Sequence, residues 1–269
     1  MVPQKHSMGL LVKIGICVVL FASGTSVGNS VQLPSIEIDS SLPRKAMPEL
    51  GESQLARILS RYYNIGLGGL KTWEQINSLK ITGTLTLAEG PLKLYAYQRK
   101  PNLFKLTLCR GEFEMVLGYD GETAWRIKPG QSPEHMPTKQ ARSFIHNSIF
   151  GNYLLYPHTN GKKIEYIGTV TVDKEHCHHI RVQLNNDYQV DYFFSVSSYL
   201  DVKVIHTDLL SGSTNSIFYR DYIRVSGIPI STYSQNYEGD KWQSTLRIED
   251  VKHNLGLTPW IFRIPKLAE

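Results

Sequence analysis

The chain has 269 residues, of which 41% are hydrophobic and 20% charged, a composition ordinary for a globular protein. Its formal net charge is +5, and its lysines and arginines are scattered without a run of five or six. This distribution gives no support to nucleic-acid binding and leaves a weak attraction to anionic membrane surfaces open. The length fits one large domain or two small ones.

The first 28 residues have the tripartite pattern of a secretory signal peptide. Lys5 and Lys13 give a basic start, the apolar run Ile14–Ala22 follows, and small residues then stand at cleavage spacing. A membrane-spanning helix needs about 20 apolar residues, so this run is too short to be one. We therefore expect export with cleavage of residues 1–28. Residues 29–50 contain three prolines among serines and charges, which predicts a linker.

Helical periodicity appears in two places. Leu55, Ile58, Leu59 and Tyr62 recur at helical spacing within residues 51–66, and a glycine-rich stretch then ends the predicted helix. A second short helical piece is indicated around Trp73. The same periodicity returns at Gln140, Phe144, Ile145, Ile149 and Tyr153, which predicts one helix over residues 137–156.

Most of the remaining chain alternates between apolar and polar side chains. For example, Leu92, Leu94 and Ala96 are expected to face one way, with Lys93 and Tyr95 facing the other. The links are short, as at Gly90-Pro91 and Asp120-Gly121, so successive strands should be neighbours. The sequence predicts a mainly β domain over residues 51–269. Its core is a curved antiparallel half-barrel sheet of about eleven strands, capped by two or three helices.

So wide a sheet has a large apolar face, which two or three short helices cover only thinly. We expect an incompletely filled interior, although a tightly packed sheet plugged by its helices would show the same sequence pattern. Burying an acyl chain yields about 0.8 kcal/mol per CH₂, so ten methylenes would gain on the order of 8 kcal/mol.

Two motifs resemble the LolA/LolB-like family of periplasmic lipoprotein carriers. They are the stretch Tyr97–Leu106, with a basic residue, Pro-Asn and an aromatic residue, and the stretch Asp120–Pro129, with Asp-Gly and Trp125. The segments 227–230 and 253–265 resemble the late strands of longer members. The resemblance runs from about residue 50 to the end. It implies an open half-barrel with an apolar cavity for lipoprotein acyl groups.

This reading places an acyl-binding cavity along the strands and under the helix at 137–156. Family members have arginine directly before the proline, where it helps to hold the lid closed; this chain has Lys100, and Arg99 points to the opposite face and cannot substitute. The departure leaves the release mechanism and the cargo open. Lys100 is the expected lid contact, and the expected cavity residues are Leu94, Phe104, Leu106, Leu117, Trp125, Phe144 and Phe194.

The function implied is that of an exported, non-enzymatic carrier or chaperone. It would bind lipoprotein acyl chains or lipid in the periplasm and hand them on for transfer to the outer membrane, without a cofactor. Expected partners are membrane-bound donor and acceptor proteins, and a monomer is expected. The alternative is an envelope sensor or protein-binding module with the same fold. Outside the expected signal peptide, whose Gly24–Gly28 run matches by chance of small residues, the sequence has no Gly-x-Ser-x-Gly motif and no serine beside an obvious base.

Two further groups of residues leave questions open. Cys109 and Cys177 could form a disulfide after export, but two ordinary thiols are the simpler expectation. In the stretch Glu175–His179, His176 and His178 would share one strand face, so a metal-dependent enzyme with a third ligand at His206 or Asp208 is a further alternative. The simpler interpretation is a polar, exposed strand start, and no metal is predicted.

Overall fold

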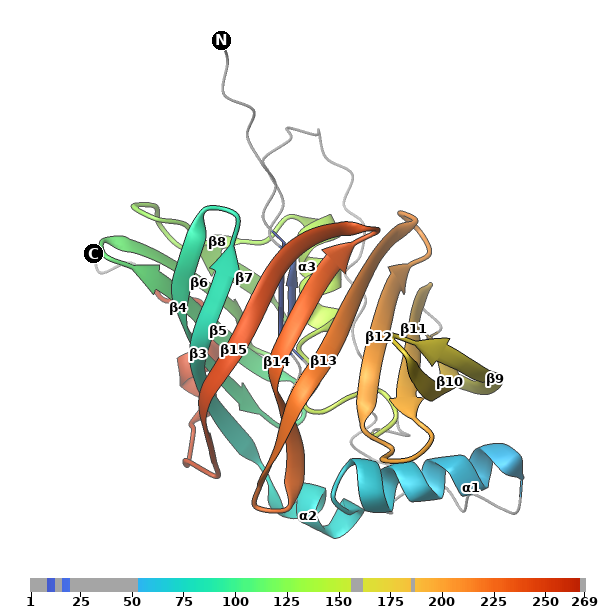
Figure 1. Cartoon of the computed structure of the whole chain (residues 1–269). Helices are drawn as coiled ribbons and strands as arrows, with labels where there is room; N and C mark the ends of the chain where they lie inside the picture. The colour runs from blue at the N-terminus through green and yellow to red at the C-terminus, as the bar shows by residue number, and fades with distance from the viewer. Residues whose placement is uncertain (1–8, 13–15, 20–52, 156–161, 185–186, 267–269) are drawn as a thin grey trace. The chain divides into compact units, whose positions relative to one another are not determined.

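The computed structural model describes residues 9–12, 16–19, 53–155, 162–184 and 187–266. Within these ranges the protein is mainly β, with one open antiparallel sheet of 13 strands and three α-helices (Figure 1). The predicted fold class, an antiparallel half-barrel sheet with helical cover, is confirmed. The sheet has 13 strands rather than about eleven because two short strands, β7 (Ala124–Ile127) and β8 (Glu134–His135), escape the alternation signal.

The chain forms two compact units. Unit 1 comprises residues 1–36, 78–150 and 242–269. Its strand order is β8-β7-β6-β5-β4-β3-β15, and each neighbouring pair is antiparallel. Its other elements are β3 (Ser78–Leu87), β4 (Gly90–Arg99), β5 (Leu103–Arg110), β6 (Phe113–Tyr119), α3 (Thr138–His146), β15 (Lys241–His253) and the 3₁₀ helix η2 (Pro259–Phe262).

The signal peptide and linker expected at residues 1–28 and 29–50 lie outside the described residues, apart from two short strands. These strands, β1 (Gly9–Val12) and β2 (Ile16–Val19), pair antiparallel with each other. β2 lies beside α3 within unit 1.

The third helix is shorter than the sequence pattern predicts. α3 ends at His146, whereas helical spacing extended to residue 156. The reason is local capping. The backbone N–H of Asn147 donates to the carbonyls of Ser143 and Phe144, and the hydroxyl of Ser148 donates to the carbonyl of Phe144 at 2.7 Å. The Ser148 backbone N–H donates to the carbonyl of Ile145, three residues back rather than four, at 3.0 Å, so the α-helical bonding pattern ends here.

Unit 2 comprises residues 37–77 and 151–241. Its strand order is β14-β13-β12-β11-β10-β9. Strand β10 begins at Glu175, so the histidine cluster lies at the start of a strand, as predicted, and the register with β9 shifts directly after His179. The elements of unit 2 are α1 (Gln54–Arg61), the π-helix η1 (Tyr62–Gly66), α2 (Leu70–Gln75), β9 (Lys163–Val172), β10 (Glu175–Leu184), β11 (Tyr188–Ser195), β12 (Asp201–Asp208), β13 (Ser213–Val225) and β14 (Ile228–Glu238).

The helices of unit 2 run across one end of its strands (Figure 1). Close backbone contact holds them there. A Cβ added at Gly66 would lie 2.1 Å from the carbonyl oxygen of Tyr199, and one at Gly68 would lie 2.1 Å from that of Gly227. Only glycine permits so close an approach. The helix predicted at 51–66 is therefore present as α1 followed by η1, fixed against two strand turns.

Candidate functional site

One face of the unit 1 sheet lies under α3 and consists almost wholly of buried apolar side chains. Alternation along three adjacent strands places them there, because every second side chain of a strand points to the same face. We call this surface the α3 face. It is made of Leu94, Ala96 and Gln98 on β4, Phe104, Leu106 and Leu108 on β5, and Leu117 and Tyr119 on β6.

The strand register sets these side chains in rows across the sheet. Ala96 pairs with Leu106, which pairs in turn with Leu117. Gln98 pairs with Phe104, whose ring centroid lies 5.4 Å from that of Phe144 on α3. The structure thus brings together five of the seven predicted cavity residues, namely Leu94, Phe104, Leu106, Leu117 and Phe144.

Trp125, also predicted in the cavity, lies on the opposite face of the same sheet. It pairs with Gly118 of β6. Leu117 and Tyr119, on either side of Gly118, point toward α3, and adjacent residues of a strand face opposite ways, so Gly118 and its partner Trp125 face away from α3. A Cβ at Gly118 would lie 2.2 Å from the Trp125 ring, which shows that the indole lies flat across the glycine. The indole N–H donates to the carbonyl of Phe262 at 2.7 Å. Trp125 therefore holds the C-terminal segment rather than lining the α3 face.

Phe194, the remaining predicted residue, belongs to unit 2. Its ring stacks on Tyr62 with centroids 4.4 Å apart, and it lies 5.6 Å from His178 and 6.2 Å from Tyr199. Burial lowers the pKa of His178, since a charged imidazole is poorly solvated among these rings. This aromatic cluster fixes η1 to the strands of unit 2.

The predicted lid contact, Lys100, lies in the turn between β4 and β5. Its ammonium is 5.7 Å from the ring centroid of Phe150, which follows α3, and the Phe150 N–H donates to the carbonyl of Pro101 at 3.3 Å. The turn thus contacts the segment that leaves α3. Arg99 points to the other face, where its guanidinium donates to the Leu257 carbonyl at 2.9 Å. It therefore takes no part in this contact.

Gln98 lies on the α3 face but is absent from the predicted cavity set, as are Ala96, Leu108 and Tyr119. It is 0% exposed, and neither end of its side-chain amide has a hydrogen-bond partner among the residues described. A signal was present in the sequence, because Gln98 continues the alternating series Leu92, Leu94 and Ala96. It is the one polar member of that series.

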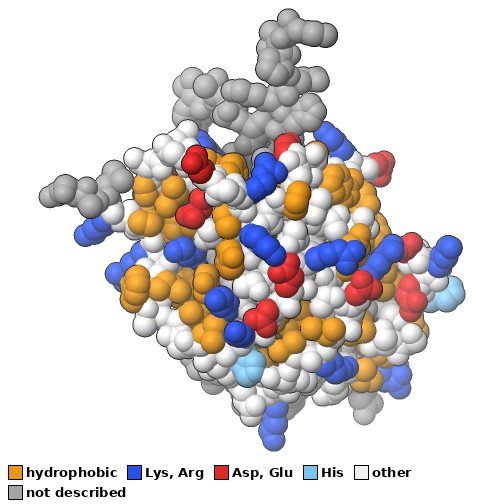
Figure 2. All heavy atoms as spheres, turned by 60° about the vertical axis from the view of Figure 1, so that its left-hand side comes forward, with side chains coloured by type: hydrophobic (Ala, Val, Ile, Leu, Met, Phe, Trp, Pro, Cys, Tyr) orange, Lys and Arg blue, Asp and Glu red, His pale blue; other side chains and the backbone are white. Residues whose placement is uncertain are grey.

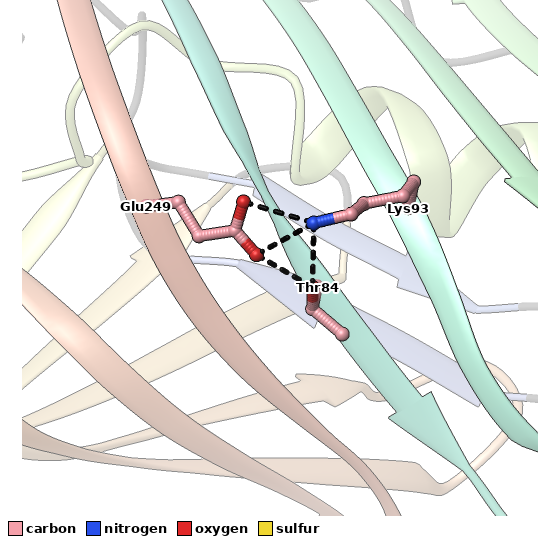
Figure 3. Close-up of polar contacts among 3 residues, drawn as sticks. All are labelled: Thr84, Lys93 and Glu249. Carbon is pink, nitrogen blue, oxygen red and sulfur yellow. Dashed lines mark hydrogen bonds and ion pairs between the residues drawn. The ribbon is translucent and has the colours of Figure 1, made fainter.

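The opposite face of the same strands is polar. Lys93, between Leu92 and Leu94, donates to both carboxylate oxygens of Glu249 at 3.0 Å, and Thr84 donates to the same carboxylate at 2.6 Å (Figure 3). These bonds, first that of Thr84 and then that of Lys93, lower the pKa of Glu249. On the face drawn in Figure 2, acidic and basic side chains are interspersed with apolar ones. This contrast identifies the α3 face as the apolar side of the sheet.

The histidine cluster resolves into separate local contacts in unit 2. His176 lies 3.2 Å from the Thr171 hydroxyl, whereas Cys177 and His178 are buried, so the predicted exposed strand start is wrong for those two. The Nε2 of His179 lies 2.6 Å from the buried carboxylate of Asp191. Within the described ranges no group of three or more His, Cys, Asp or Glu side chains is placed to hold a metal ion.

Asp191 shows how a buried charge is satisfied on this fold. Burial alone would raise its pKa, but hydrogen bonds from His179, Arg181 and Gln189 outweigh burial and hold the pKa below its usual value. Cys109 and Cys177 are free thiols. No helix in the described part is both long enough and apolar enough to cross a membrane.

The sequence and the fold were compared with those of known proteins. No protein-family model matches the sequence, and no curated protein matches it. A crystal structure of a LolA superfamily protein from Nitrosomonas europaea superposes with a TM-score of 0.55 at 13% identity, covering 79% of this chain and 98% of that one. The chain has a LolA-like fold.

Two other solved structures are also similar. A DUF1329 family protein from Desulfovibrio piger gives a TM-score of 0.54 at 10% identity, covering 76% of this chain and 97% of that one. A putative outer membrane lipoprotein-sorting protein domain from Vibrio parahaemolyticus gives 0.48 at 10% identity, with 72% and 95% covered. At such identities the likeness concerns the fold.

Proposed function

We propose that the protein is an exported, non-enzymatic carrier that binds the acyl chains of lipoprotein or lipid on the α3 face and hands them on for transfer to the outer membrane. The observation that supports this most is the α3 face itself. It is an almost wholly apolar surface three strands wide, and the nine-residue helix α3 covers it. The LolA-like fold supports the same reading.

Loading would proceed by exchange of one apolar partner for another. Ala141, Phe144 and Ile145 of α3 are buried, and the ring of Phe144 lies against Phe104 of the sheet. If α3 moves away, an acyl chain can take over these apolar contacts. Each CH₂ buried contributes about 0.8 kcal/mol, so a chain of moderate length offsets the contacts that α3 gives up.

Two polar contacts link the ends of α3 to neighbouring segments. Arg126 on β7 donates to the side-chain oxygen of Gln140 near the helix start, and Lys100 lies over the ring of Phe150 after its end. Such contacts can be broken and remade at small cost, since they are partly solvated. We assign to Lys100 the role of a reversible lid contact.

The full proposal includes the predicted processing and partners. Residues 1–28 are removed on export, residues 29–50 act as a linker, and residues 51–269 function as one carrier domain in the periplasm. The carrier acts as a monomer between membrane-bound donor and acceptor proteins. Sequencing the N-terminus of the exported protein tests whether residues 1–28 are removed, and its native mass tests whether it is a monomer.

The test of carriage is native mass spectrometry with lipid extraction on protein purified after export. We expect co-purifying acyl chains on the wild type and their loss in Ala96→Phe, which fills the centre of the α3 face. Thr107→Phe adds the same ring to the opposite face of β5 and should keep the ligand. Leu106→Glu should also abolish binding. A wild-type protein that is free of ligand and takes up no added lipid would refute the proposal.

A second candidate function, protein binding, is favoured by the edge strand β9. It is the last strand of the sheet order in the described part, is ten residues long, and exposes Ile167 and Val170 at 47% and 42%. Long edge strands with apolar side chains can pair with a partner chain. Capture of one dominant protein by the wild type, lost in Val170→Lys while acyl binding is absent, would favour this function over carriage.

A further inference from the structure

The buried amide of Gln98 calls for a physical explanation. The side chain is 0% exposed, and both Nε2 and Oε1 lack a partner among the described residues. Its cross-strand neighbours on this face are Leu79 and Phe104, which offer only apolar side chains. Burying an amide without hydrogen bonds costs free energy, and native structures rarely leave such groups unsatisfied.

Elsewhere the protein satisfies buried or half-buried glutamines. Gln189 donates its amide N–H to Asp191 at 2.7 Å, and Gln140 accepts from Arg126. At position 98 an apolar residue would fit the pattern of Leu92, Leu94 and Ala96 without cost. A polar group kept at this position therefore points to a partner that is absent from the protein alone.

We propose that Gln98 is the polar anchor of the α3 face and hydrogen-bonds the carbonyl end of a bound acyl chain, with a preference for acyl chains joined through a secondary amide. The inference rests on the proposed carrier function and names the ligand class for the same site. Nε2 needs an acceptor and Oε1 needs a donor. A secondary amide supplies a carbonyl and an N–H, an ester supplies only an acceptor, and a hydrocarbon supplies neither.

The chemistry predicts an order of affinity that the apolar part of the site cannot produce. For chains of equal length, the amide should bind most tightly, the ester next and the hydrocarbon least. All three bury similar apolar area, so their differences report the polar anchor. One satisfied hydrogen bond corresponds to a change of about tenfold in dissociation constant at most sites.

The experiment measures dissociation constants by displacement of the fluorescent dye N-phenyl-1-naphthylamine. The probes are N-methyldodecanamide, methyl dodecanoate and tetradecane, each tested on the wild type and on Gln98→Met, which keeps the side-chain length and removes the amide. We expect the wild type to bind the amide about tenfold or more tightly than the hydrocarbon. Gln98→Met should bind all three within about twofold of one another, by loss of affinity for the amide.

Controls keep the result interpretable. Gln235→Met makes the same replacement at a half-buried position of β14 in unit 2 and should keep the wild-type order. Gln98→Leu repeats the test should the methionine variant fail to fold. Without ligand, Gln98→Met and Gln98→Leu should each unfold at a urea midpoint at least as high as that of the wild type.

The outcomes separate this inference from the function on which it rests. If the wild type binds the three probes equally, or if Gln98→Met keeps the preference for the amide, the anchor is refuted while carriage stands. If the wild type binds none of them, and also lacks co-purifying acyl chains, both the anchor and the carrier function are refuted.

Discussion

Replacing Gly118 with alanine should destabilise unit 1 by wedging Trp125 away from the sheet. The new Cβ would lie 2.2 Å from the Cε2 and Cζ2 atoms of the indole and 2.6 Å from its Nε1. Such distances are far inside van der Waals contact, so the ring must move. It is 0% exposed, and its N–H donates to the carbonyl of Phe262 at 2.7 Å. The ring therefore cannot shift without losing packing or that bond.

The magnitude follows from three contributions. Overpacking a core costs about 1 to 3 kcal/mol. Weakening the buried indole hydrogen bond adds about 1 to 3 kcal/mol. Alanine at a backbone position that it can adopt returns about 0.4 to 1 kcal/mol by restricting the unfolded chain. The centres of these ranges give a net destabilisation of about 3 kcal/mol, which is a large fraction of the stability of an ordinary domain.

The assay is urea unfolding at equilibrium, followed by circular dichroism. The matched background is Trp125→Leu, which removes the ring that the new methyl group would strike. In that background Gly118→Ala should be close to neutral, so the double-mutant cycle should show a coupling of about 2 kcal/mol or more. Additive effects of the two substitutions would refute the placement of Trp125 across Gly118. Acyl binding should persist in folded Gly118→Ala, because the change lies on the face away from α3.

Three further outcomes are expected. Tyr62→Phe removes the hydroxyl that donates to Asp201 at 3.2 Å and accepts from Asn152 at 2.9 Å. It should lower the free energy of unfolding by about 1 to 3 kcal/mol in urea titrations, and a loss below about 0.5 kcal/mol would contradict this hydrogen-bond network. Burial lowers the pKa of Lys162 to about 7, so above that pH the unfolded chain holds a proton that the folded chain has released. Stability should therefore rise by about 2 kcal/mol from pH 7 to pH 9, and Lys162→Met should remove that rise. Burial, followed by the charge of Glu175, raises the pKa of the Cys177 thiol to about 11. A maleimide at pH 8 should therefore label the half-buried Cys109 before Cys177 in the native protein, and equal labelling rates would contradict this expectation.

The faces of the long strands could be predicted from the sequence because burial imposes a period of two. Phe104, Leu106 and Leu108 all point to the α3 face, as their alternation indicates. The same logic fails for the short strand that holds Trp125. Four residues, Ala124–Ile127, give too little alternation to fix a face, and the turn at Asp120–Thr123 sets the register instead. Arg126 then points toward α3, where Gln140 accepts from it.

The end of the helix that follows residue 137 and the polar residue of the α3 face were not predicted, for different reasons. Helical spacing of apolar residues continues past His146, but Asn147 and Ser148 cap the helix with local bonds that periodicity does not report. Gln98 was visible as a polar interruption of an apolar series. Its significance lies in the absence of a partner among the described residues, which depends on the three-dimensional surroundings and not on the sequence.

Asn236 shows why an unpaired amide must be tested with ligand present. It lies on β14 of unit 2 opposite Ile217, is 1% exposed, and neither end of its amide has a partner within the described ranges. If its only effect is a desolvation cost, Asn236→Leu should stabilise the protein by about 1 to 3 kcal/mol whether or not acyl amide is added.

Gln98→Met should behave differently, because its stabilisation depends on the ligand. At a concentration 100 times the wild-type dissociation constant, N-methyldodecanamide stabilises the wild type by about 2.7 kcal/mol. A variant that binds tenfold more weakly gains only about 1.4 kcal/mol at that concentration. The advantage of Gln98→Met should therefore shrink by about 1.3 kcal/mol on adding the amide, while that of Asn236→Leu stays constant. Equal shrinkage in both variants would mean that the amide also contacts unit 2, and the anchor could no longer be assigned to the α3 face alone.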